Sequence, residues 1–244
     1  GRGSSSLLLG TTTIRCCIMT VMANLFSAGR GFNLHKPLGH PMTIHIYQDD
    51  LPPNLDFGDV VAIDTETMGL NPLRDRLCLV QLSSGDGEAH LVKINSPMKP
   101  CPNLTALLEN TSLTKLFHFA RFDISSLSHS ITPVKGPIYC TKIASKLART
   151  YTDRHGLKDL CRELLQIDIS KQQQSSDWGT TTISTEQAEY AAGDVIYLHK
   201  IREKLDGMLL REARADIAAQ CFTFLPTQAR LDLTGFAGVD IFHH

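Results

Sequence analysis

The feature that most constrains the fold is a short apolar run that ends in two acids. Residues 60–63 read VVAI and are followed directly by Asp64, Thr65 and Glu66. Such a run is typical of a buried β-strand, and residues i and i+2 of a strand point to the same side. Two carboxylates on one side repel each other, and burial strengthens the repulsion. The pattern therefore predicts either a pair of ligands for a cation or a strand that ends in solvent.

Other strands and helices are predicted on both sides of this run, because apolar residues alternate in some stretches and recur at three- and four-residue spacing in others. The predicted strands cover 43–47, 59–64, 77–84, 88–94 and 115–119, and the first four are expected to form an antiparallel meander. The predicted helices cover 102–110, 121–129, 141–150, 156–167 and 184–225, with Ser184 or Thr185 capping the last. This order predicts an α/β fold, a mixed sheet flanked by helices.

Bulk composition limits the number of domains and the kind of partner. The chain has 244 residues, of which 42% are hydrophobic, and this suits one well-packed domain. Its formal net charge of −1 argues against a protein that coats long nucleic acid through counterion release. The seven cysteines are odd in number and irregularly spaced, which favours reduced thiols in a cytoplasmic protein. No apolar run is long enough to span a membrane.

The first 41 residues differ from the rest of the chain. They contain no aspartate or glutamate, and the first acid is Asp49. Their Arg, Ser and Thr content resembles a transit peptide, and residues 16–28 resemble the apolar core of a signal peptide. Met42, directly before a predicted strand, suits a natural start. We expect 1–41 to be a disordered or non-native extension, or a targeting segment, and 42–244 to form a single domain.

Further candidate ligands lie on other predicted elements. Asp123 follows the predicted strand 115–119, near the start of a helix. Tyr190 and Asp194 stand at i and i+4 of a predicted helix, hence on one face, and the small residues 191–193 between them allow a close approach. The chain thus offers several acids and a phenol, each at the end or on the face of a regular element.

Carboxylates without histidine or cysteine favour Mg²⁺ or Mn²⁺ over Zn²⁺. One magnesium ion usually takes one or two carboxylates, so the four acids predict two ions. Two ions suit an in-line displacement at phosphorus, one positioning the attacking water and the other stabilising the leaving oxygen.

Three motifs together resemble those of the DEDD exonuclease superfamily, which has the ribonuclease H-like fold. They are DTE at 64–66, FD at 122–123 and YAAGD at 190–194. Tyrosine four residues before the last aspartate marks the tyrosine subtype, whereas the histidine subtype has histidine at the position of Glu189. The wider segments at 164–179 and 183–201 resemble ribonuclease D.

A narrower resemblance covers essentially residues 42–244. The segments at 140–161 and 224–242 are similar to nanoRNase C, a group of short alphaproteobacterial enzymes that degrade RNA dinucleotides and assemble as ring-like octamers. The resemblance implies that the metal ligands are Asp64, which would bridge the two ions, Glu66, Asp123 and Asp194. Tyr190 would contact the attacking water, and because the usual tyrosine pKa is near 10 it would orient this water as a protonated phenol.

Candidate substrate contacts are less specific. Leu70 stands six residues after Asp64, as does the leucine that related oligoribonucleases wedge between two bases, although a packed loop leucine is an equal alternative. His118 could face the site or be a core histidine. Trp178 is expected to anchor its loop. Polar or cationic candidates for gripping phosphate or sugar, some of which would ordinarily belong to a solvated loop, are Arg121, Lys171, Gln173 and Gln174.

The expected function is a cytoplasmic, metal-dependent 3′–5′ exoribonuclease that hydrolyses RNA dinucleotides to mononucleoside 5′-monophosphates. The resemblance implies a homo-oligomer, with an octamer as the size expected from it. One alternative is a ribonuclease D-like enzyme that trims longer RNA or DNA. Two observations argue against it: the net charge is close to zero, and we do not expect the additional C-terminal helical domain that ribonuclease D carries. The other is a non-catalytic nucleic-acid-binding or assembly module.

Overall fold

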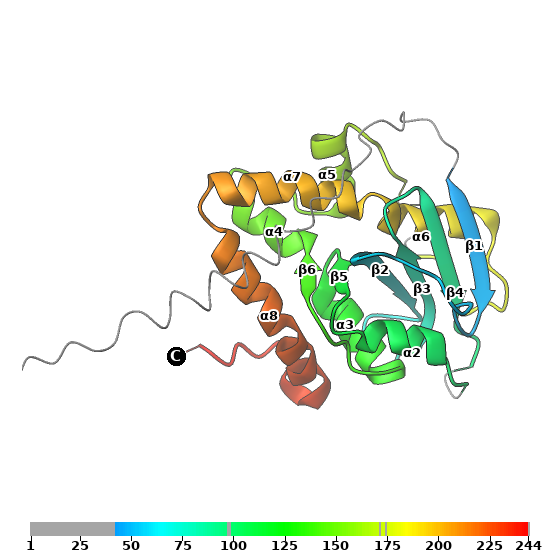
Figure 1. Cartoon of the computed structure of the whole chain (residues 1–244). Helices are drawn as coiled ribbons and strands as arrows, with labels where there is room; N and C mark the ends of the chain where they lie inside the picture. The colour runs from blue at the N-terminus through cyan, green and yellow to red at the C-terminus, as the bar shows by residue number, and fades with distance from the viewer. Residues whose placement is uncertain (1–41, 97–98, 171, 174, 244) are drawn as a thin grey trace, which may run out of the picture. The chain divides into compact units, whose positions relative to one another are not determined.

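The computed structural model describes residues 42–96, 99–170, 172–173 and 175–243 (Figure 1). The prediction for residues 1–41, and those for Lys171 and Gln174, lie outside these residues. The strands are β1 (Thr43–Gln48), β2 (Val60–Thr67), β3 (Leu77–Ser83), β4 (Glu88–Lys93), β5 (Thr114–Phe117) and β6 (Ile138–Cys140). The α-helices are α2 (Pro102–Glu109), α3 (Ala120–Ser130), α4 (Thr141–Ala148), α5 (Leu157–Leu160), α6 (Thr185–Ile196), α7 (Leu198–Arg211) and α8 (Ala215–Leu231), and two π-helical turns are η1 (Cys161–Leu165) and η2 (Asp232–Phe236).

The strands form one mixed sheet in the order β1-β4-β3-β2-β5-β6. Strands β2, β3 and β4 are antiparallel neighbours, whereas β5 lies parallel to β2 and β6 parallel to β5. The α/β fold is therefore confirmed. Because β2, β5 and β6 are parallel, their carboxyl ends meet at one edge of the sheet, and this brings residues 64–66, 118–123 and 141–142 to the same region.

Three details of the predicted fold were wrong. Strand β1 pairs in parallel with β4 and is not part of an antiparallel meander, because alternation along a strand carries no information about its direction. The short strand β6 was missed, since three residues are too few to establish a period. The helix predicted over 184–225 is three helices, interrupted at Tyr197 and again before α8, where Ala213 has a φ of 53°.

Helices pack on the sheet and on one another (Figure 1). Helix α6 packs against β2, β3 and β4, and α3 packs against β2, β3 and β5. Helix α8 packs against α3 and β6, and α7 against α4. Apolar side chains of the parallel strands and α3 fill the main core, among them Ile63, Phe117, Ile124 and Leu127. No described helix is long and apolar enough to cross a membrane.

Side chains cap the N-termini of α6 and α2. Ser184 accepts a hydrogen bond from the Gln187 backbone N–H at 3.2 Å, and the Gln187 side-chain oxygen accepts from the Ser184 N–H at 2.9 Å. This capping box confirms Ser184 as the start of α6. Helix α2 is capped from a distance, because the Asp50 carboxylate accepts from the N–H groups of Asn103 and Leu104.

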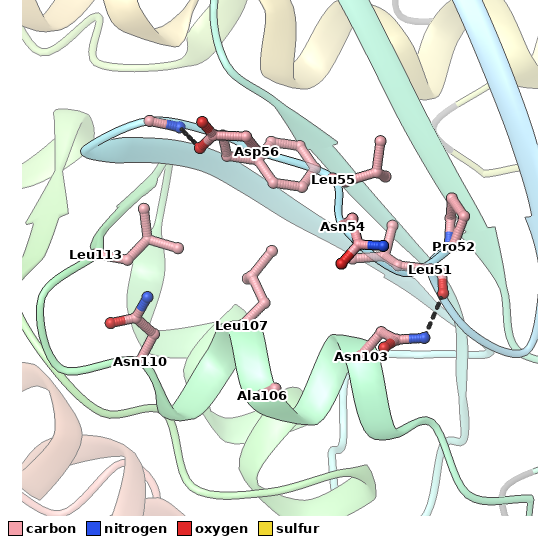
Figure 2. Close-up of a pocket in the computed structure, with 12 residues that line it drawn as sticks. Leu51, Pro52, Asn54, Leu55, Asp56, Asn103, Ala106, Leu107, Asn110 and Leu113 are labelled. Atoms are coloured by element: carbon pink, nitrogen blue, oxygen red, sulfur yellow. Dashed lines mark hydrogen bonds between the residues drawn. The ribbon is translucent and has the colours of Figure 1, made fainter.

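Residues 51–58 and α2 enclose a hollow of about 290 Å³ (Figure 2). The Asn103 side-chain amide donates to the Leu51 carbonyl at 2.8 Å, and the Asp56 carboxylate accepts from the Gly58 N–H at 2.8 Å. None of the predicted catalytic acids lines this hollow, so it is separate from the site described next.

Candidate metal and catalytic site

Three carboxylates converge where α6 crosses the end of β2. Asp64 and Glu66 stand at i and i+2 on β2, and Asp194 lies on α6. One carboxylate oxygen from each residue lies within 4.8 Å of the others. Ala191 and Ala192 of α6 are fully buried, and their small side chains let the helix approach the sheet this closely.

Asp123 stands beside this group. It lies in the first turn of α3, and Phe119, the residue directly before this helix, has a φ of 74° that turns the chain sharply from β5 into α3. Asp123 is only 2% exposed, and it accepts a hydrogen bond from the Thr65 hydroxyl at 2.7 Å. Thr65 comes between the two acids of β2, so this bond ties α3 to the acidic end of that strand.

Burial and mutual repulsion raise the pKa values of these acids. Burial, followed by the charges of Asp123, Asp194 and Glu66, raises the pKa of Asp64 well above its usual value. The same kinds of cause raise the pKa of Glu66 to about 9 and, with burial dominant, that of Asp123 to about 7. Within the described part of the chain, none of these three acids forms an ion pair with lysine, arginine or histidine.

The arrangement fits a divalent cation. Clustered carboxylate oxygens are hard ligands, and a bound cation replaces their repulsion by attraction. Gln81 donates through Nε2 to an Asp64 oxygen at 3.2 Å and so helps to orient this carboxylate. Asp64, Glu66 and Asp194 therefore lie where a divalent metal such as Mg²⁺ would be held.

We expect the stability of the metal-free protein to fall as the pH rises between about 4.5 and about 9. The Glu66 pKa is higher in the folded than in the unfolded chain, so the folded state binds more protons in this window, and its stability is lost as they leave. Thermal unfolding in EDTA, with and without excess Mg²⁺, measures the effect. Mg²⁺ should raise the midpoint most at high pH, and Glu66→Gln should flatten the EDTA profile. Identical profiles with and without Mg²⁺ would contradict the metal assignment.

Tyr190, which lies on α6, is next to the acidic cluster. It is half-buried, with its ring centroid 6.1 Å from that of Trp178. Burial raises its pKa above the usual value, and the charges of Asp194 and Glu66 add to this. Tyr190 therefore carries its proton at neutral pH, which agrees with a phenol that donates a hydrogen bond and does not act as a base.

Leu70 projects from the loop between β2 and β3, which hydrogen bonds close at its base. It is 87% exposed, so the alternative of a packed loop leucine is wrong. The Met68 N–H donates to the Arg76 carbonyl at 3.1 Å, which closes the loop, and Asp75 accepts from the Asn71 N–H at 3.0 Å. The loop thus holds an apolar side chain in solvent.

The other predicted contacts are placed differently. The half-buried His118 has its Nδ1 2.8 Å from the Thr141 hydroxyl, at the carboxyl ends of β5 and β6. Arg121 is engaged by Asp232 through two hydrogen bonds of 2.6 Å each, so any contact with phosphate would compete with this pair. Gln173 is half-buried and lines a hollow of about 280 Å³ beside Tyr190 and Asp194.

Several residues of the site were missed in the sequence. Gln81 and Thr65 contact the acids, yet each is an ordinary strand residue with no local signal beyond Thr65 standing between two acids. The contact of Lys142 with the exposed Phe119 ring, 4.1 Å from Nζ to the ring centre, was also not predicted. Only the pairing of β5 with β6 brings Lys142 next to the second motif.

Comparisons with known proteins identify the family of the chain. A family model described as 3′-5′ exonuclease matches residues 49–210. Ribonuclease D of Acidiphilium cryptum is 32% identical over 160 residues, which are 66% of this chain and 40% of that protein. Ribonuclease D of Gluconacetobacter diazotrophicus is 31% identical over 169 residues, 69% of this chain and 42% of that protein. The chain thus spans about two fifths of the length of these curated relatives.

Solved structures give a longer match. Brucella melitensis NrnC bound to pGG is 55% identical with a TM-score of 0.80, over 83% of this chain and 99% of that one. The same nuclease with bound Mg²⁺ is 54% identical with a TM-score of 0.79, over 83% and 100%. Escherichia coli RNase D, at 23% identity and a TM-score of 0.62 over 70% and 45%, shares the fold. The resemblance to nanoRNase C and ribonuclease D is confirmed. The chain belongs to the 3′–5′ exonuclease family and, within it, to the group that includes Brucella melitensis NrnC.

Proposed function

We propose that this protein is a metal-dependent 3′–5′ exoribonuclease that hydrolyses RNA dinucleotides to mononucleoside 5′-monophosphates. The observation that carries the proposal is the convergence of Asp64, Glu66 and Asp194 within 4.8 Å, with Tyr190 alongside. Brucella melitensis NrnC, a relative 55% identical, has been captured with pGG, and this supports a short substrate here.

The metal ligands would be the four acids of the motifs, holding two ions, Mg²⁺ or Mn²⁺. The ions would supply an activated water and stabilisation of the leaving oxygen. Thr65 holds the Asp123 carboxylate, and Gln81 orients that of Asp64. Tyr190, protonated because its pKa is raised, would donate a hydrogen bond to the attacking water and so fix its direction.

On the substrate side, the exposed Leu70 would wedge between the two bases. Stacking on an apolar wedge does not depend on base identity, which suits a nuclease without sequence preference. His118 lies at the same edge of the sheet as Asp123 and would contact sugar or phosphate. Lys171 and Gln174, which flank Gln172 and Gln173 in the sequence, remain candidates for a further contact; of these four, Gln172 and Gln173 line the hollow beside Tyr190.

Residues 42–244 would form a single nuclease domain. The domain would act in the cytoplasm as a homo-oligomer, with an octamer as the expected size. The described cysteines are all free thiols, as expected in a reducing compartment. The exposed apolar side chains of Phe236, Val239, Ile241 and Phe242 near the C-terminus would suit a subunit contact.

Substrate length tests the proposal. The full chain with Mg²⁺ or Mn²⁺ is incubated in parallel with a 5′-labelled RNA dinucleotide and a 5′-labelled RNA heptanucleotide. We expect the dinucleotide to be cleaved at least tenfold faster. A fixed pocket for the 5′ end would leave no room for the remaining nucleotides of a longer strand, whose binding would lose about 1.4 kcal/mol or more. Stepwise shortening of the longer RNA at an equal rate would instead favour a ribonuclease D-like trimming enzyme.

A further inference from the structure

Two cationic side chains hold the segment of residues 176–179 by its backbone carbonyls. Lys93 Nζ donates to the Trp178 carbonyl at 2.5 Å, and Arg76 Nη2 donates to the Gly179 carbonyl at 3.0 Å. Gln187 of α6 adds a bond from its Nε2 to the Ser176 hydroxyl at 2.7 Å. We call Arg76, Lys93 and their two carbonyl partners the loop clamp.

Lys93 is an unusual residue for this purpose. Its side chain is 1% exposed, and no described carboxylate forms an ion pair with it. Burying an ammonium group without a carboxylate partner costs free energy unless the group is hydrogen-bonded, and the bond to the Trp178 carbonyl offsets part of this cost. The positions of Lys93 and Trp178 are therefore coupled.

Trp178 connects the loop clamp to α6, the helix that carries Tyr190. It is 4% exposed and packs in a small apolar cluster with Cys78, Leu79 and Leu91. Tyr190 packs against this cluster, with its ring tilted by 38° to the indole. One side of the Tyr190 ring is thus supported by Trp178, while its hydroxyl end lies among the acids.

The clamp also reaches the base of the loop that carries Leu70. The Arg76 carbonyl accepts from the Met68 N–H, and Arg76 Nη1 donates to the Ile94 carbonyl at 3.0 Å. Gly179 lies against the same loop, since a Cβ at this position would be 3.2 Å from the Met68 methyl carbon. Residues 68–76 and 176–179 are therefore fixed to each other.

We propose that Trp178, held by Lys93 and Arg76, is a positioning residue that fixes the Tyr190 ring for hydrolysis. The inference rests on the proposed function, in which the Tyr190 hydroxyl orients the attacking water. Without the indole, the phenol gains freedom to move away from the acids. A displacement of about 1 Å in a reacting group lowers the rate by up to about 10²-fold.

A double-mutant cycle tests this coupling with the full chain. Trp178→Leu should lower kcat on an RNA dinucleotide at least tenfold and change KM less than twofold. In a Tyr190→Phe background, the same replacement should lower kcat less than twofold further, because the positioned hydroxyl is already absent. Equal losses in both backgrounds would overturn the proposal. Trp178→Phe, which keeps an aromatic ring against Tyr190, should recover most of the rate and would exclude a general folding defect.

Fluorescence gives a measurement that does not depend on activity. Trp178 is the single tryptophan of the chain, so emission reports its environment directly. Lys93→Met should shift the emission to longer wavelength and lower kcat, and Lys93→Arg should restore both in part. Lys204→Met, at an exposed position of α7, should change neither. Emission and kcat equal to those of the wild type in Lys93→Met would overturn the proposal. A wild-type protein without activity would overturn the proposed function instead, and the emission shift in Lys93→Met would still test the clamp.

Discussion

Replacing Asp64 by asparagine is expected to abolish hydrolysis and, without metal, to leave the fold at least as stable. The carboxylate lies within 4.8 Å of those of Glu66 and Asp194, so its loss removes one ligand charge from the candidate metal centre. A metal ion is worth several kcal/mol to a phosphoryl-type transition state, and about 4 kcal/mol corresponds to roughly 10³-fold in rate. Asparagine keeps an oxygen for Gln81, and it removes a buried acid whose own pKa is raised by burial and by the charges of Asp123, Asp194 and Glu66.

Two measurements separate these effects. Dinucleotide hydrolysis at saturating Mg²⁺ gives the rate, and thermal unfolding in EDTA gives the stability. Glu203→Gln is the matched control, because this exposed acid on α7 lies outside the acidic cluster and should retain full activity. Substantial activity in Asp64→Asn, at any Mg²⁺ or Mn²⁺ concentration, would remove Asp64 from the metal centre.

Replacing Tyr190 by phenylalanine is expected to lower kcat about 10² to 10³-fold while metal affinity is unchanged. The hydroxyl is the only group lost, and the remaining ring keeps its contact with Trp178. Since the Tyr190 pKa is raised, the hydroxyl is protonated over the whole neutral range. The wild-type rate should therefore show no loss up to pH 9 that can be assigned to ionisation of this residue.

Metal titration and kinetics check this expectation together. Binding of Mn²⁺ to the wild-type and Tyr190→Phe chains is measured by calorimetry, and kcat by dinucleotide hydrolysis. Equal Mn²⁺ affinity with a reduced kcat agrees with an orienting role. An unchanged kcat would exclude Tyr190 from the mechanism, and a loss of Mn²⁺ binding would make it part of the metal centre instead.

Much of the site could be predicted because its signals are local. Asp64 and Glu66 share a strand face through a period of two, and Tyr190 and Asp194 share a helix face through a spacing of four. The start of α6 was predictable for the same reason, since Ser184 and Gln187 form a capping box within one turn. The order of these motifs along the chain indicated the family that the comparisons confirm.

Contacts between distant elements could not be predicted in this way. Arg121 has a neighbouring acid in Asp123, yet its partner is Asp232 on the turn that follows α8, 111 residues away. The parallel placement of β1 beside β4 and the support of Tyr190 by Trp178 likewise depend on which elements pack together. A lysine at position 93 gave no sign in the sequence that it would be buried against a carbonyl.

The sequence by itself determined which side chains share a face, and hence that two carboxylates and a tyrosine–aspartate pair were available as ligands. Only the tertiary structure decided that β2 and α6 meet, that their acids lie within 4.8 Å, and that burial raises their pKa values. The physical reason is that backbone periodicity is a local property, whereas burial and most of the repulsion arise from the packing of elements that are distant along the chain.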